Sequence, residues 1–129
     1  MSNKIATIAL VVPDYAAGIT FYCGALGFTL VEDTDMGQGK HWVLVAPPGG
    51  GVRLLLAKAA DQRQAAAIGN QTGGRVGFFL ETDDFARDHA AFTRAGVMFL
   101  ESPRHEAYGS VAVFEDPFGN KWDLIEPKG

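Results

Sequence analysis

The sequence has almost no cysteine and no long apolar run. Its single thiol, Cys23, excludes an internal disulfide framework, and a helical pattern without a partnered histidine favours a packed side chain over a nucleophile. The apolar N-terminal run, residues 5–12, is interrupted by Thr7 and closed by Pro13, so it is too short to span a bilayer. No signal-peptide cleavage site follows it. We therefore expect a cytoplasmic protein with no membrane partner.

Basic residues are also scarce. The 11 lysines and arginines are outnumbered by 15 acidic residues, which gives a net charge of −4, and no run of like charge occurs. Because nucleic-acid binding requires clustered positive charge, we expect no nucleic-acid partner. What is present is an ordinary globular composition, 47% apolar and 20% charged. A chain of 129 residues has room for one domain with one continuous core.

The two halves of the chain repeat one pattern at an offset of about 70 residues. Each half has a strand, a helix and a second strand; the strands lie at residues 5–12 and near 29–32, then at 76–82 and near 98–101. A strand, a Pro/Gly turn and another strand follow, which is typical of a hairpin. The alignment of these hairpins pairs Pro48 with Pro117, Gly50 with Gly119, and Leu54 with Asp123.

The helix ends also repeat. Each helix begins after an aspartate that can cap it, Asp14 and then Asp83 or Asp84, and ends at Gly27 or Gly96. The pattern predicts a single domain over residues 1–129, made of two βαβββ modules at about 4–57 and 75–126. A linker at about 58–74 joins them, and its Ala- and Gln-rich first part could form a short helix.

Short motifs near both ends resemble those of the vicinal oxygen chelate superfamily, which includes glyoxalase I, bleomycin-resistance proteins and extradiol dioxygenases. The resemblance covers about residues 4–126, and the motifs that carry it are Val12-Pro13-Asp14, Phe21-Tyr22, Leu26-Gly27-Phe28, Glu115-Asp116-Pro117-Phe118-Gly119-Asn120 and Trp122-Asp123-Leu124-Ile125-Glu126. It implies an α+β fold in which two tandem βαβββ modules form a curved open sheet around a cleft, with helices on the outer face. It also implies a homodimer. Enzymes of this family hold Zn, Ni, Fe or Mn through His, Gln and Glu, whereas its antibiotic-sequestering members have the same cleft without a metal.

The resemblance places four metal-ligand positions on the first and last strand of each module. Here they correspond to Thr7, about Leu54, Gly77 and Asp123. A catalytic metal needs about three protein ligands with nitrogen, thiolate or carboxylate donors. Only Asp123 supplies one, so we expect no family-type metal and no other cofactor. The histidines, His41, His89 and His105, have no spacing that would rebuild a site.

Strand alternation indicates which side chains face the expected cleft. It places Asp123 there as a lone acid among the apolar side chains of Ala9, Leu54, Phe79 and Val113. Burial should raise the pKa of such a carboxyl unless Lys121 or a cation of the ligand pairs with it. The polar segment 104–109 is either a rim of this cleft or a solvated loop whose charges pair with each other. The candidates for ligand binding are Thr7, Trp42, Leu54, Phe79, Arg104, His105, Glu106, Tyr108 and Asp123.

The hypothesis that follows is a protein that binds a small organic molecule and either sequesters it or transforms it without a family-type metal. One alternative is a metal-dependent lyase or dioxygenase whose missing ligands come from a partner chain or from unaligned positions. Another is an interaction domain without a ligand. Bound metal after purification separates the first two, and a ligand-induced rise in melting temperature separates the first from the third.

Overall fold

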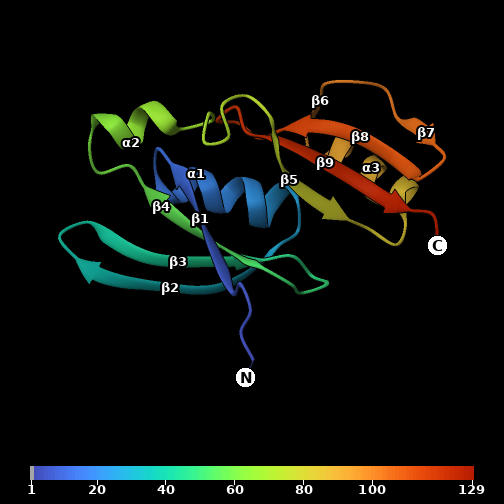
Figure 1. Ribbon diagram of the computed structural model, residues 1–129. Helices are drawn as coiled ribbons and strands as arrows, with labels where there is room; N and C mark the ends of the chain where they lie inside the picture. The colour runs from blue at the N-terminus through green and yellow to red at the C-terminus, as the bar shows by residue number, and fades with distance from the viewer. Residues whose placement is uncertain (1) are drawn as a thin grey trace. The chain divides into compact units, whose positions relative to one another are not determined.

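A computed structural model describes residues 2–129 and divides the chain into two compact units, with the division between Ile68 and Gly69 (Figure 1). Each unit has a strand, a helix and an antiparallel set of strands, so the predicted α+β fold with two βαβββ repeats is confirmed. The single-domain organisation stays a prediction. Within the described residues, no helix combines the length and the apolar character needed to cross a bilayer.

Unit 1 has a four-stranded sheet in the order β1-β4-β3-β2, in which β1 is parallel to β4. Its elements are β1 (Thr7–Val12), α1 (Tyr15–Ile19), the π-helical segment η1 (Thr20–Ala25), β2 (Thr29–Gly37), β3 (Lys40–Ala46), β4 (Arg53–Lys58) and α2 (Gln62–Ala67). The helix α2 lies where the alanine- and glutamine-rich segment indicated one. The Asp14 side chain caps α1 by accepting the Ala17 N–H at 2.7 Å, as expected.

The core of unit 1 forms between the sheet and the α1–η1 segment. Gly18 allows a close approach of α1, because a Cβ there would lie 2.9 Å from Leu56 Cδ1 and 3.5 Å from Val12 Cγ1. The buried apolar side chains are Leu10, Val12, Tyr22, Leu26, Phe28, Val43, Leu44, Val45, Leu54 and Leu56. The edge strand β2 is exposed along its whole length. The homodimer stays a prediction, and this uncovered edge could accommodate it.

Unit 2 repeats the plan with the strand order β5-β9-β8-β6, in which β5 is parallel to β9. Its elements are β5 (Val76–Glu81), α3 (Phe85–Arg94), β6 (Met98–Phe99), β7 (Arg104–Glu106), β8 (Gly109–Glu115) and β9 (Lys121–Pro127). The short strands β6 and β7 pair with successive parts of β8, so together they take the place of one interrupted edge strand. Asp84 caps α3, since its side chain accepts the Arg87 N–H at 3.0 Å.

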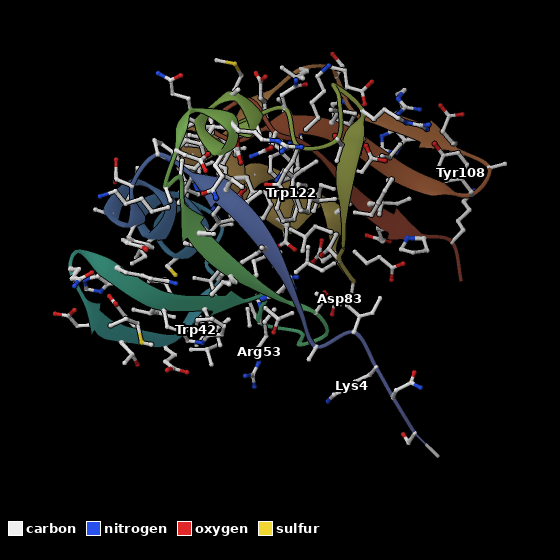
Figure 2. The ribbon with its side chains drawn as sticks, turned by 60° about the vertical axis from the view of Figure 1, so that its left-hand side comes forward. Lys4, Trp42, Arg53, Asp83, Tyr108 and Trp122 are labelled. Carbon is white, nitrogen blue, oxygen red and sulfur yellow. The ribbon has the colours of Figure 1, made fainter. Side chains whose placement is uncertain are left out.

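The core of unit 2 is aromatic and lies between the sheet and α3. Phe114 is at its centre, with ring centroids 5.8 Å from Phe92 of α3 and 5.8 Å from Trp122 of β9. Phe78 of β5 stacks on the other side of Trp122 at 4.5 Å. The side-chain view places Trp122 in the interior of the unit (Figure 2).

The two hairpins differ in length, and this changes the repeat expected from the sequence. The connection between β3 and β4 is one residue longer than that between β8 and β9. Leu44 therefore pairs with Leu55, whereas its counterpart Val113 pairs with Asp123. The expected equivalence of Leu54 and Asp123 is wrong, and Leu55 is the counterpart. Because adjacent strand residues point to opposite faces, this shift turns Leu54 into the core, where it is 5% exposed.

Candidate functional site

The face of the unit 2 sheet opposite α3 carries most of the polar candidates. The alternating residues Ala112, Phe114, Trp122 and Leu124 are buried on the α3 side. Their neighbours therefore point the other way. We call this other side, which presents Phe79, Val113 and Asp123 from the adjacent strands β5, β8 and β9, the helix-free face.

Asp123 lies at the middle of the helix-free face. It pairs in register with Phe79 on one side and Val113 on the other, and it is half-buried. Within residues 2–129, no hydrogen bond or ion pair reaches its carboxylate. Burial raises the pKa of the Asp123 carboxyl above its ordinary value; the charge of Arg104 opposes that rise and the charge of Glu101 adds to it.

Arg104 enters the same face from β7, because it pairs in register with Val111. Its guanidinium Nε donates to Glu101 Oε1 at 3.0 Å. Its Nη1 donates to Glu106 Oε1 at 3.3 Å and to the Tyr108 hydroxyl at 3.4 Å. The charges of this segment therefore pair with each other, as the self-paired alternative expected. Arg104 is on the same face of the sheet as Asp123, and the role of the segment as the rim of a cleft stays a prediction. Figure 2 shows Tyr108 at the turn between β7 and β8.

Glu101 is the residue of this site that the sequence analysis missed. It lies in the gap between β6 and β7, where the edge of β8 would otherwise lack a partner. Its Oε2 accepts the backbone N–H of Val113 at 2.9 Å, and its Oε1 accepts Arg104 Nε. These hydrogen bonds, the one from Arg104 first, lower the pKa of Glu101. No sequence spacing signals that a side chain will substitute for a strand backbone at this point.

His105 does not join the group around Arg104. It lies between Arg104 and Glu106 on β7, so its side chain points to the opposite face of the sheet. There its Nδ1 lies 2.9 Å from Ser110 Oγ, and its ring contacts Phe85 of α3 edge-on at 6.5 Å.

The remaining candidates belong to unit 1. Trp42 alternates with the buried Val43, so it points away from α1, and it is 38% exposed (Figure 2). Thr7 is exposed at the start of β1 and pairs in register with Arg53. Leu54 is in the core, as described above.

The donor set does not fit the metal centre that the family resemblance implies. Among residues 2–129 no group of three or more His, Cys, Asp or Glu side chains is arranged to hold a metal ion. Of the four positions that the resemblance assigned, Thr7 pairs in register with Arg53, Leu54 is in the core, and Gly77 has no side chain, so only Asp123 offers a carboxylate. The residues that pair in register with Asp123 and Leu55 are Phe79 and Ala9, and they have no donor atom either.

The comparison with protein families gives a clear assignment. The profile described as Glyoxalase/Bleomycin resistance protein/Dioxygenase superfamily matches residues 4–124. The chain therefore belongs to the glyoxalase/bleomycin resistance protein/dioxygenase superfamily, as the motifs at both ends indicated.

Individual relatives extend over nearly the whole chain. An uncharacterized protein of Shewanella frigidimarina is 52% identical over 128 residues, which cover 98% of this chain and 95% of that one. The solved structure of UcmS2 has a TM-score of 0.83 at 25% identity, covering 97% of this chain and 98% of its own. The structure of TnmS3, described as an antibiotic binding protein from a Streptomyces species, has a TM-score of 0.78 at 28% identity, covering 98% of both chains.

Proposed function

We propose that this protein binds a small organic molecule on the helix-free face of unit 2 without a family-type metal, and that Asp123 anchors the ligand. The observation that carries the proposal is the half-buried Asp123 carboxylate, which has no hydrogen-bond partner within the described residues. A desolvated carboxylate gains more from a donor than an exposed one does, so a ligand amine or hydroxyl would bind it strongly.

The surroundings of Asp123 favour a ligand that is aromatic and cationic. Phe79, its register partner, is 66% exposed, so its ring is available to a flat ligand and to a cation. The acidic groups here are Asp123, Glu101 and Glu106. They outnumber the two positive charges, Arg104 and Lys121, the second of which is two residues before Asp123 on the same face of β9, so this part of the face is negative. A positively charged aromatic molecule is therefore the class that we expect to bind best.

Sequestration of a natural product is the form of binding that we propose. TnmS3, similar in fold and 28% identical, is described as an antibiotic binding protein. Binding alone requires an anchor and an apolar surface, and Asp123 and Phe79 supply them.

A charge series of one fluorophore tests the proposal. We expect naphthylmethylammonium to bind more tightly than naphthylmethanol, and naphthylacetate to bind least. Asp123→Asn should weaken binding of the cation by about 10- to 100-fold, because a hydrogen bond to a charged group contributes about 1.5–3 kcal/mol. The neutral probe should change little. Fluorescence titration at pH 7 measures all three.

Asp83→Asn is the matched control, because it removes the same charge from unit 2 at an exposed position that pairs only with Arg87. It should leave the charge series unchanged. Equal affinity of the wild type for all three probes would contradict the role of Asp123. Stability provides a second check. Because folding raises the pKa of Asp123 above its ordinary value of 3.8, the contribution of Asp123 to the free energy of unfolding falls as pH rises from 3.8 through the folded-state pKa. Asp123→Asn should lack this fall.

Metal removal is the second test. We expect purified protein to contain far less than stoichiometric transition metal, and chelation to leave the melting temperature unchanged, since removal of a bound metal would lower it. Elemental analysis and thermal unfolding with and without chelator measure this. Stoichiometric zinc, nickel or iron that is lost in Asp123→Ala would overturn the metal-free proposal and favour a metal-dependent lyase or dioxygenase.

A further inference from the structure

The helix-free face of unit 2 contains an arginine and an aspartate that do not pair. Arg104 and Asp123 are on the same face, on the two strands that flank β8, where Arg104 pairs with Val111 and Asp123 pairs with Val113. The charge of Arg104 also lowers the pKa of the Asp123 carboxyl. Within the described residues, however, no ion pair joins them, and the Arg104 guanidinium binds Glu101 and Glu106 instead. A half-buried carboxylate is a strong acceptor, so this separation needs a structural cause.

Glu101 provides that cause, because it is held in place from the other side. Its Oε2 accepts the Val113 N–H of β8 at 2.9 Å, which ties the side chain to the sheet edge. Its Oε1 then holds Arg104 Nε at 3.0 Å, the shortest of the guanidinium's contacts. The two other contacts of Arg104, to Glu106 and Tyr108, are longer, at 3.3 and 3.4 Å.

We propose that Glu101 is a positioning residue that holds Arg104 away from Asp123 and so keeps the Asp123 carboxylate available to a cationic ligand. Without Glu101, Arg104 keeps only its two longer contacts with exposed groups, which contribute little. The guanidinium then turns toward Asp123 and occupies the acceptor that the ligand would use. This role concerns specificity, and its consequence for ligand affinity rests on the function proposed above.

Glu101→Gln is the informative substitution, because the glutamine oxygen can still accept the Val113 N–H while the charge that holds Arg104 is lost. We expect it to weaken binding of naphthylmethylammonium by about tenfold, a loss of about 1.4 kcal/mol. Glu115→Gln, on β8 of the same sheet, removes the same charge without touching Arg104 and should have no such effect.

The double variant Glu101→Gln/Arg104→Met separates positioning from a merely structural role. Arg104→Met alone should tighten binding of the cation, because it removes a repelling charge from the face. If Glu101 acts through Arg104, the double variant binds the cation as tightly as Arg104→Met does. If it remains weaker by the full effect of Glu101→Gln, the proposal is overturned.

A measurement without any ligand makes the outcome independent of the proposed function. The Arg104 Nε–H resonance in a nitrogen-15 spectrum should respond to Asp123→Asn much more strongly in the Glu101→Gln background, where the two groups pair, than in the wild-type background, where they interact only at a distance. A resonance that ignores Asp123 in both backgrounds overturns the positioning role. If the wild type binds no probe but the resonance responds as expected, the proposed function fails and the positioning role of Glu101 is supported.

Discussion

Gly69→Ala should lower the free energy of unfolding by about 2–5 kcal/mol, from backbone strain and overpacking together. Gly69 has a φ of +71°, which alone costs alanine about 1–2 kcal/mol. In addition, a Cβ at this position would lie 1.8 Å from the carbonyl oxygen of Phe118. This contact is to backbone in the β8–β9 turn, so the segment at Gly69 and the turn would have to separate. Denaturant unfolding measures the loss.

Gly73→Ala is the matched control for this prediction. Gly73 has the same φ of +71°, but an added Cβ there meets no heavy atom within 4 Å. It should therefore show only the backbone strain of about 1–2 kcal/mol. Equal destabilisation by the two substitutions would show that Gly69 does not pack against the turn as closely as described.

Asp116→Ala should be comparably damaging, with an expected loss of about 3–5 kcal/mol, because it removes a buried acceptor that serves several donors. Asp116 is 4% exposed, and its Oδ1 accepts the N–H groups of Phe118 and Asn120, both at 2.9 Å. Its Oδ2 accepts the Asn120 side-chain amide at 2.7 Å. Thermal and denaturant unfolding would measure the loss.

Asp35→Ala is the control for this substitution. Asp35 also accepts a backbone N–H in a turn, that of Gly37 at 2.8 Å, but it is exposed and serves this one donor. Its loss should cost no more than about 1 kcal/mol. A small effect of Asp116→Ala, similar to that of Asp35→Ala, would be inconsistent with a turn held by this carboxylate.

The prediction for Asp116 also explains what the C-terminal family motif does. In the run from Asp116 to Asn120 the aspartate and the asparagine are buried and bind each other. These polar residues build the turn that sets the register of β8 against β9. The motif therefore identifies the fold and does not indicate which reaction, if any, the fold supports. This is why it occurs here beside a donor set unsuited to the family metal.

Local patterns in the sequence were sufficient for the overall plan. The repeat, the capping aspartates Asp14 and Asp84, and the alternation in β5, β8 and β9 each depend on neighbouring residues and a fixed period. They placed Asp123 beside Phe79 and Val113, and the structure has these three on adjacent strands. Burial around Asp123 was foreseeable for the same reason, since its neighbours on both sides were apolar.

The identity of the groups around Asp123 was decided only by the tertiary structure. One extra residue in the β3–β4 turn makes Leu55 the counterpart of Asp123 and turns Leu54 inward. An alignment of the two halves of the sequence that continues through this turn does not show where the strand pairing resumes, so it could not detect the extra residue. Glu101 acquired its role because β6 and β7 leave a gap along β8 that its side chain fills. Local periodicity determines which face a side chain takes, whereas strand register and edge interruptions depend on pairing between distant segments. The fold and the position of Asp123 were therefore contained in the sequence, and its relation to Glu101 and Arg104 was not.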